Sequence, residues 1–420
     1  MTEKTSAVAS TTAKALATPK SQSTWALAWR RFRRHKLAIA ASVVILLLVS
    51  MALFASLIAP YDPTAIPSDL VNSQFLPPSA EHWLGTDDLG RDVLSRIIYG
   101  SRISLLVGFI AAFTSVLIGT VLGILAGYFS GQSFNVYTGP FSRTANPEQP
   151  LFFASSATSK FSLTWLPLVP SWILFYLVLY GCGLIGWILV EPVVQRGFSS
   201  GAWDAGAFVG LVLLGITAVG AIWGLFGRIS IDLDILISRW IDFMLTIPAL
   251  PLNLVLSAFL RDPNTGFGQW AQQIFGESAS VFIIISIITI FGWLTIARLV
   301  RGTILSLREQ EFTAAAKALG SSESRVMFHH LLPNALTPII VQTTLQVGGA
   351  LLTEAALSFL GFGIQPPVAT WGNMLTNAQN YIFNSPWLAF PPGVMILLTV
   401  LAFNYLGDGL RDALDPRSRR

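Results

Sequence analysis

Long apolar runs separated by short polar stretches dominate the chain. Six of these runs are candidates for membrane helices, at about residues 37–59, 103–128, 231–260, 279–297, 339–360 and 393–406. Roughly twenty apolar residues in a helix match the hydrocarbon thickness of a bilayer. Because the runs are continuous and do not alternate, they predict helices and exclude the short strands of a membrane barrel. The pattern therefore indicates an all-α polytopic membrane protein.

Two more apolar runs lie between the second and third of these, near 161–190 and 205–226. With them the chain is predicted to have about eight spans. An added pair of spans leaves the sidedness of everything downstream unchanged.

Small residues and prolines mark special positions within the spans. Gly119, Gly123 and Gly127 are four residues apart, so they share one helix face and predict close packing against a neighbouring helix. Pro248 and Pro251 interrupt the third run, where we expect a kink.

The two ends of the chain are polar. Residues 1–24 are mostly Ala, Ser, Thr and Lys, a composition that predicts disorder. Trp25, Trp29 and Phe32 follow at helical spacing among arginines, which favours an interfacial helix on anionic lipid. The alternative is a plain basic flank. Both readings put the N-terminus in the cytoplasm, because positive charge near spans stays inside, and the basic tail at 408–420 lies there too.

The composition narrows the class of protein further. The chain has 420 residues, of which 53% are hydrophobic and 11% are charged, with a formal net charge of +4. That charge lies at the ends and in polar loops, so it predicts membrane orientation and no nucleic-acid partner. A single cysteine, Cys182, excludes an intramolecular disulfide and a Cys-based metal site. No cleavable signal is evident, since the first apolar run begins late.

No catalytic motif is present in the sequence. A phosphate-binding loop of the Gly-x-x-x-x-Gly-Lys-Ser/Thr type is absent, so any energy source must be another polypeptide. His329 and His330 are adjacent and would point in different directions on a helix, which makes them a poor metal pair. We therefore expect no catalytic residue, no metal and no cofactor bound by this chain.

The loop at 309–334 is polar and long, although it joins two apolar runs. Residues 309–319 are strong helix formers, and Gly320 stands where a left-handed residue would end a helix. Ser321 or Ser322 can cap a second short helix, which Pro333 is expected to stop. Loops of this length are usually functional, although a plain amphipathic connection is the simpler alternative.

This loop resembles the cytoplasmic "EAA" loop of binding-protein-dependent ABC importer permeases. In that family the loop docks on the ATPase subunit and couples it to the spans. The resemblance implies coupling roles for Glu311, Ala314, Ala315, Ala316, Gly320, Glu323, Arg325 and Pro333. Ala314 stands where the namesake Glu would be, so Glu311 or Glu323 would have to replace it. The cytoplasmic side also follows from three arginines nearby, Arg298, Arg301 and Arg308.

A compact polar element follows the first span. It contains alternating acids and glycines, namely Gly85, Thr86, Asp87, Gly90, Arg91 and Asp92. A calcium loop is excluded because the spacing does not fit an EF-hand, which favours turn-forming polar packing. The element is similar to the "LGTDxxGRD" stretch of the dipeptide/oligopeptide/nickel branch of the permease family.

Two further acids lie in or beside spans. Asp242 is three residues after Arg239, with which it can pair at the membrane edge. Glu354 lies inside the fifth run, where an ionisable residue is a functional candidate by default. Residues 354–361 resemble a stretch typical of the same branch, which favours packing or gating over substrate selectivity.

The resemblance covers about 25–130 and 230–420. It implies a six-span type I ABC importer permease core, with an insertion at about 131–228 that carries the two extra spans. It also implies a second homologous permease, two ATPase subunits that hold ATP and Mg, an extracytoplasmic substrate-binding protein and membrane lipid as partners. The expected organisation is a tail at 1–24, an interfacial helix and first span at 25–60, an external segment at 61–100, the transmembrane core at 101–407 and a cytoplasmic tail at 408–420.

The expected function is ATP-driven import of short peptides, or of a related solute such as nickel, an opine or a sugar, across the cytoplasmic membrane. A stand-alone secondary transporter would need broken spans and an ion-coupling cluster, and only Glu354 lies clearly within a span. A membrane subunit that has lost transport is the other alternative, favoured only by Ala314.

Overall fold

The computed structural model describes residues 24–137, 228–262 and 265–414, and between 137 and 228 only 154–155, 180–181, 183–184, 187 and 210–218. The expected disordered tail and most of the two extra spans, 161–190 and 205–226, lie outside the described residues. The predicted total of about eight spans is therefore not tested.

Five stretches of the described chain are long and apolar enough to cross a membrane. They are α3 (Lys36–Leu53), α6 (Val93–Tyr128), α12 (Ala279–Arg308), the continuous stretch Glu323–Phe359, and Pro386–Leu414, which contains α17 (Phe390–Leu414). A sixth span results if α9 (Leu233–Thr246) and α10 (Ala249–Arg261), which are bent by 90° at their junction, count as one. The protein is thus a helical multi-pass membrane protein with five or six spans in its described part.

The break between α9 and α10 confirms the kink expected at the prolines. Pro248 is the N-cap residue of α10 and Pro251 lies in its first turn. The missing N–H groups of both prolines cost little there, because the first turn of a helix has no intrahelical acceptors for them.

The remaining helices are short and connect the spans. They are α2 (Thr24–Phe32), α4 (Ala55–Ile58), α5 (Leu70–Ser73), α11 (Gly266–Phe275), η2 (Gly276–Ser278), α13 (Glu311–Ala318), α14 (Glu323–Arg325), η3 (Val326–Leu331), α16 (Trp371–Gln379) and η4 (Pro386–Leu388); α15 (Leu332–Phe359) continues from η3.

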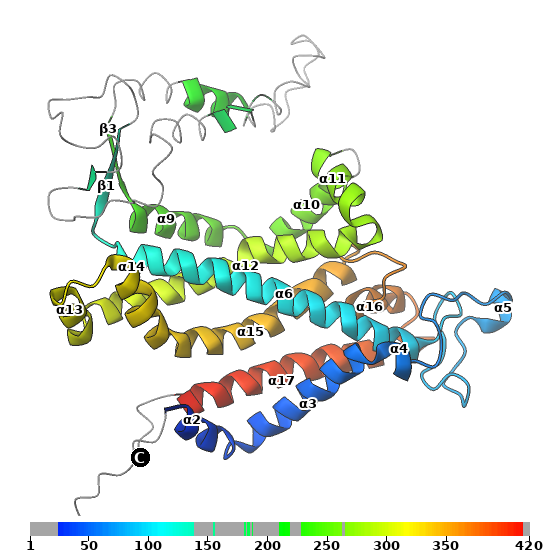
Figure 1. The fold of residues 1–420 in the computed structure, drawn as a ribbon. Helices are drawn as coiled ribbons and strands as arrows, with labels where there is room; N and C mark the ends of the chain where they lie inside the picture. The colour runs from blue at the N-terminus through cyan, green and yellow to red at the C-terminus, as the bar shows by residue number, and fades with distance from the viewer. Residues whose placement is uncertain are drawn as a thin grey trace, which may run out of the picture. The chain divides into compact units, whose positions relative to one another are not determined.

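The chain divides into two compact units, and α6 and α12 contribute to both. In the first unit, made of residues 1–120, 247–299 and 335–420, α3 runs along α17 and α2 packs against α17 (Figure 1). Ala28 of α2 is buried, whereas Trp29 is 62% exposed and its ring stacks on that of Phe32. An exposed Trp29 beside a half-buried Phe32 on a basic helix fits the interfacial helix expected from the sequence.

Close helix contact at the predicted glycine face is confirmed at two positions. A Cβ added to Gly119 would lie 2.7 Å from the Trp293 carbonyl oxygen, and one added to Gly127 would lie 2.8 Å from that of Arg301. Real Cβ atoms do not approach backbone oxygens so closely, so α6 and α12 pack backbone to backbone at these glycines.

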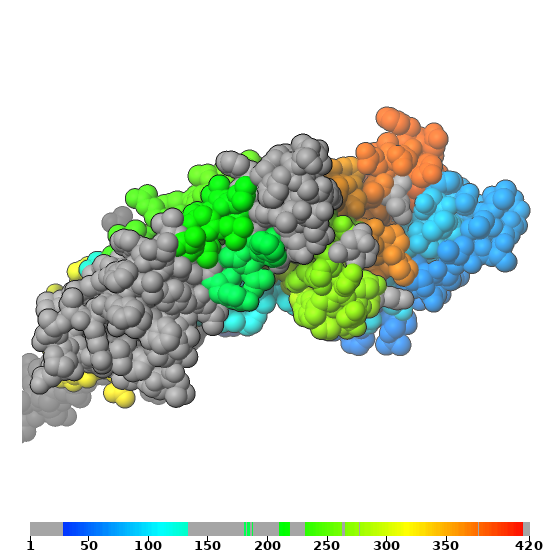
Figure 2. Space-filling model, turned by 90° about the horizontal axis from the view of Figure 1, so that it is seen from above, coloured from blue at the N-terminus to red at the C-terminus, as the bar shows by residue number. Residues whose placement is uncertain are grey.

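A second packing region of the first unit lies where the connections between its spans meet. The segment that precedes α6 packs against α16 and η4: the rings of Phe75 and Tyr381 are 4.4 Å apart, and Leu84 and Trp387 join the same apolar cluster. Figure 2 shows these two parts of the chain, in blue and orange, side by side.

The second unit, residues 121–246 and 300–334, contains a small sheet that the all-α prediction missed. β1 (Ser133–Tyr137) is the middle strand between β2 (Ala154–Ser155) and β3 (Arg228–Asp232), and both pairings are antiparallel (Figure 1). Strands β1 and β3 alternate polar and apolar residues with the period of a strand. The ninety residues between them in the sequence hid the pairing. The sheet lies outside the candidate spans, so the all-α class predicted for the membrane-spanning part stands.

Candidate functional site

The polar element before α6, residues 85–92, folds into a compact turn whose side chains hydrogen-bond mainly to one another; we call this turn the knot. Gly85 and Gly90 have φ angles of +76° and +72°, which only glycine adopts without strain. Asp87 accepts hydrogen bonds from the Arg91 Nε (2.8 Å) and from the backbone N–H groups of Leu89 and Arg91 (3.0 and 2.9 Å). The carboxylate therefore organises the turn around itself.

Asp92 links this knot to the start of α6. Its Oδ2 accepts hydrogen bonds from the Ser95 N–H (2.8 Å) and hydroxyl (2.7 Å), and its Oδ1 lies 2.9 Å from His82 Nδ1. The carboxylate thus satisfies an N–H of the first helical turn and places negative charge at the positive end of the helix.

The charges of the knot neutralise one another. Thr86, Asp87, Arg91 and Asp92 are all at most 5% exposed, and Arg96, which is 1% exposed, has its Nε 3.4 Å from Asp87. Burial, together with the neighbouring Asp87 charge, raises the pKa of Asp88. Within the described residues no group of three or more His, Cys, Asp or Glu side chains could hold a metal. The structure brings all six predicted residues together as a structural turn.

The 309–334 loop begins with α13 and a left-handed glycine, as predicted. Gly320 has a φ of +80°. Its N–H bonds to the Lys317 carbonyl (3.0 Å), and the Ser321 N–H bonds to the Ala316 carbonyl (3.1 Å). These two bonds make the Schellman arrangement, which satisfies the last carbonyls of a helix.

The second half of the loop differs from the prediction. Ser322 is the N-cap residue of α14 by its backbone angles, but its side chain makes no capping bond. Pro333 does not stop the helix: α14, the π-helical turn η3 and α15 run on without a break from Glu323 to Phe359. A π turn already skips regular i to i−4 bonds, so a proline that lacks an N–H fits directly after it.

One face of α13 is buried and the other is exposed. Thr313 and Ala316 are buried, and the Thr313 hydroxyl donates to the Leu307 carbonyl (2.9 Å). The other predicted coupling residues of the loop are mostly exposed, and only Glu323 is half-buried. The exposed ones are Glu311, Ala314, Ala315, Gly320, Arg325 and Pro333. The residue that stands for the namesake acid, Ala314, therefore faces outward.

Tyr128, the last residue of α6, connects three helices of the second unit. Its hydroxyl donates a hydrogen bond to the Glu323 carboxylate, and its ring lies 5.0 Å from Lys317 Nζ, within cation–π range. Its carbonyl accepts from Arg308 (2.9 Å), which also bonds the Ser130 carbonyl (2.8 Å). Burial and the nearby Arg308 charge lower the pKa of Lys317.

An ion pair joins α9 to α12 in the same unit. The Nε and Nη2 atoms of Arg301 donate to the two carboxylate oxygens of Asp234, the Nη2 bond at 2.8 Å. The Ser130 hydroxyl donates to Asp234 at 2.6 Å. Asp234 is 6% exposed, whereas the predicted Asp242 is exposed on the same helix. The buried acid of α9 is thus the one that the sequence analysis did not select.

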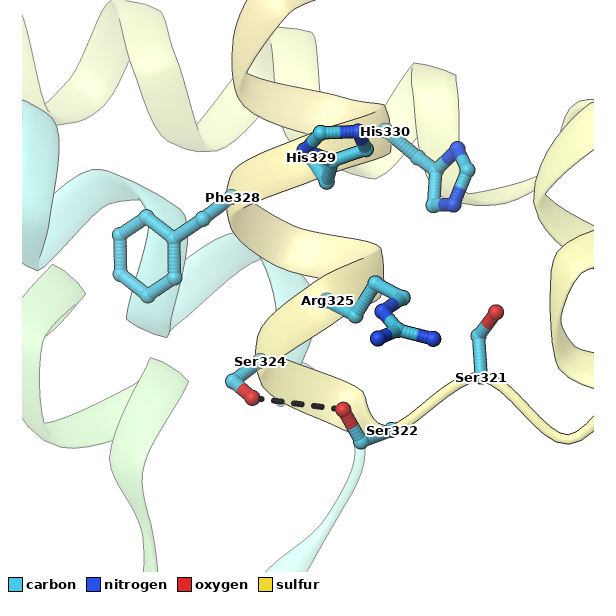
Figure 3. A pocket seen from close by; sticks show the side chains of 7 residues that line it. All are labelled: Ser321, Ser322, Ser324, Arg325, Phe328, His329 and His330. Carbon is cyan, nitrogen blue, oxygen red and sulfur yellow. Dashed lines mark hydrogen bonds between the residues drawn. The ribbon is translucent and has the colours of Figure 1, made fainter.

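An open hollow lies on the outer side of the Gly320 bend. It is lined by Ser321, Ser322, Ser324, Arg325, Phe328, His329 and His330, and Figure 3 shows Phe328 and His330 on opposite sides of the helix. The rings of His329 and His330 are 5.8 Å apart and nearly perpendicular. Phe312, Leu319 and Phe328 are also exposed large apolar residues, and Leu319 is 88% exposed.

Glu354 is buried in the first unit, far along α15 from the loop in sequence. It is 1% exposed and accepts a hydrogen bond from the Ser358 hydroxyl (2.8 Å). The same hydroxyl accepts from the Ile364 N–H (3.2 Å), which ties α15 to the segment that follows it. These bonds hold Glu354 within a packed turn.

Tyr128, Asp234, Lys317 and Arg308 were not predicted as site residues. Arg301 and Arg308 were interpreted only as charges that orient the membrane protein. Their position near the end of an apolar run was the available signal, because the carbonyl groups at a helix end need hydrogen-bond donors.

Comparisons with known proteins agree with the fold. Residues 215–420 match the family model of the binding-protein-dependent transport system inner membrane component, and residues 23–78 match that of the N-terminal TM domain of oligopeptide transport permease C. The chain is similar to the dipeptide transport system permease protein DppC of Alkalihalophilus pseudofirmus, with 34% identity over 399 residues (94% of this chain, 91% of the relative).

Two other relatives are covered to a similar extent and are named for other substrates. They are the oligopeptide transport system permease protein OppC of Bacillus subtilis (30% over 401 residues, 96% of this chain and 92% of the relative) and the glutathione transport system permease protein GsiD of Pectobacterium atrosepticum (30% over 394 residues, 94% and 91%). The chain belongs to the family of binding-protein-dependent transport system inner membrane components, the permease subunits of ABC importers.

Proposed function

We propose that this chain is the transmembrane permease subunit of an ATP-driven importer of short peptides. It acts with a second homologous permease, two cytoplasmic ATPase subunits that hold ATP and Mg, and an extracytoplasmic substrate-binding protein. The observation that carries the proposal is the 309–334 loop. One face is bonded to neighbouring helices, Glu323 to Tyr128 of α6 and Thr313 to the Leu307 carbonyl of α12, and the other presents exposed apolar and basic side chains next to a hollow.

The exposed side of α13 is the surface on which the ATPase docks. Phe312 and Leu319 supply apolar contact area there, and Ala314 and Ala315 let a partner approach closely. Of the two acids that could replace the missing one at Ala314, Glu323 is already bonded to Tyr128. Glu311, exposed in the first turn of α13, is therefore the acid that faces the ATPase.

Movement of the loop reaches the spans through continuous helix. When ATP binding closes the ATPases, α13 and α14 move together around Gly320. Because α14, η3 and α15 have no break between Glu323 and Phe359, this displacement passes directly into a membrane span. The spans then switch between inward-open and outward-open states, a transition of packed rigid elements.

The loop and both termini lie on the cytoplasmic side in this proposal. Positive charge supports it: Arg298, Arg301 and Arg308 end α12, and α2 carries Arg30 and Arg31. The 61–100 segment and its knot then face outward, where the binding protein arrives. Short peptides are the proposed substrate class, because the names of the relatives include dipeptide, oligopeptide and glutathione transport.

Purification from native membranes followed by reconstitution tests the proposal. We expect an ATPase and a second permease to co-purify, and proteoliposomes to accumulate labelled di- and tripeptides only with ATP and binding protein, in a vanadate-sensitive manner. Flux that needs no ATP would instead identify a stand-alone transporter. A complex with an ATPase but without any uptake would identify a non-transporting subunit.

A further inference from the structure

We propose that Tyr128 is a positioning residue for coupling: it holds the two helices on either side of Gly320 at a fixed angle and ties them to the end of α6. This inference rests on the proposed ATPase coupling and adds the residue that makes α13 and α14 move together.

The Gly320 bend needs an external support. A Cβ added at Gly320 would meet nothing within 4 Å, so no side chain packs into the bend. The two backbone bonds at Gly320 and Ser321 end α13 but do not reach α14. The angle between α13 and α14 therefore depends on contacts made by residues further along each helix.

Tyr128 makes a contact on each side of the bend. Lys317, in the last turn of α13, lies over the Tyr128 ring, and Glu323, the first residue of α14, accepts a hydrogen bond from the Tyr128 hydroxyl. Tyr128 is 1% exposed and its ring packs edge-on against Phe129, 5.1 Å away. A side chain fixed in this way has one orientation, and it transmits that orientation to both helices.

The backbone of the same residue is fixed as well. Arg308, the last residue of α12, donates to the carbonyls of Tyr128 and Ser130, where a helix end leaves acceptors without partners. The end of α6 is therefore bound to α12 while its last side chain holds α13 and α14. Displacement of the loop must move the end of α6.

The test removes the hydroxyl alone. Tyr128→Phe keeps the ring for Lys317 and deletes the bond to Glu323. Tyr99→Phe is the matched control, since Tyr99 lies in the same helix and also has a cation, Arg102, 6.0 Å from its ring centroid. Peptide uptake and ATP hydrolysis are measured on the same reconstituted complexes, and backbone hydrogen exchange of residues 311–325 is measured on the purified permease.

In Tyr128→Phe we expect at least about threefold less peptide imported per ATP hydrolysed, and at least about threefold faster exchange in 311–325, because a bond to a charged group is lost. Tyr99→Phe should match wild type in both. Glu323→Ala, which removes the acceptor, should reproduce the lower ratio, and the double variant should be no worse than either single one, since both substitutions remove the same bond. A merely structural role would lower the amount of complex without changing the ratio.

The two readouts separate this inference from the proposed function. Wild-type exchange and a wild-type ratio in Tyr128→Phe would overturn the positioning role while ATP-driven uptake stands. The opposite outcome is faster exchange in Tyr128→Phe combined with no vanadate-sensitive uptake by the wild-type complex. That result would overturn the proposed coupling function, and the coupling role of Tyr128 with it.

Discussion

The knot before α6 and the loop after α12 are both polar, glycine-bent connections, yet they use charge in opposite ways. In the knot, Asp87 and Asp92 are bonded to residues of the knot itself and to the helix that follows, and nearly all of the charge is buried. In the loop, Glu323 is bonded to Tyr128 of α6 and Thr313 to the Leu307 carbonyl of α12, and one face of α13 is exposed. Hydrogen bonds made within one segment make that segment rigid. Hydrogen bonds from a segment to other helices let a partner that moves the segment move those helices as well.

Breaking the knot is expected to have the largest effect. Asp87→Ala leaves Arg91 and Arg96 buried without their main partner, and removal of one member of a buried pair costs about 3 kcal/mol or more. We expect little folded protein in the membrane, measured by fluorescence-detected gel filtration and by the melting temperature in detergent. Wild-type yield and melting temperature would show that the knot does not stabilise the protein.

Distorting the loop should abolish transport while the protein remains folded. Gly320→Val places a branched side chain at a φ of +80°, which costs about 1–2 kcal/mol of strain and shifts the bend between α13 and α14. Gly361→Val is the matched control: its φ is +84°, and a Cβ there also meets nothing within 4 Å. Both variants should reach the membrane, and only Gly320→Val should lose ATP-dependent uptake. Equal uptake by the two would refute the special role of the loop.

A smaller effect is expected at the edge of the knot. Burial raises the pKa of Asp88, so its ionised form is less favourable in the folded protein than in the unfolded one. Asp88→Asn should therefore raise the melting temperature slightly at neutral pH. The gain should disappear as the pH falls below the pKa of the unfolded carboxyl, where the wild-type residue is neutral in both states. A destabilised Asp88→Asn protein at pH 7 would contradict this.

The smallest effect on transport is expected from removal of the insertion. Tyr137 and Arg228 are directly opposite in the β1–β3 ladder, so Asn-Gly can replace residues 138–227 as a two-residue hairpin turn. If the bonds of the loop to α6 and α12 are sufficient for coupling, uptake should stay within about twofold of wild type in the same reconstituted assay. Loss of substrate selectivity alone would show that the insertion contributes to the transport path.

Much of the fold follows from local sequence signals. Five apolar runs lie in spans, although α6 begins at Val93 and not at 103, α12 ends at Arg308 and not at 297, and the next helix begins at Glu323 and not at 339. Pro248 marks the break in the remaining run. Gly320 took the predicted left-handed conformation because glycine after a helix-forming stretch is a strong local signal. The knot could be selected as a unit from the spacing of its acids and glycines.

The parts that could not be predicted depend on distant partners. Tyr128 and Glu323 are 195 residues apart, and Asp234 and Arg301 are 67 apart. Nothing in the residues around Asp234 and Asp242 distinguishes the acid that becomes buried and hydrogen-bonded to Arg301. Pro333 was predicted to end a helix because a π turn is not visible in a residue pattern, and it is this turn that lets the helix continue.

The uninterrupted helix from Glu323 to Phe359 has a mechanical consequence. It contains the π turn η3 and Pro338, so it is one continuous backbone element and not a straight rod. Glu354 and Ser358 lie near its C-terminal end, and the Gly320 bend adjoins its N-terminal end. A movement at the bend can therefore reach the turn that Glu354 holds along a single helix, without crossing a loop that would absorb it.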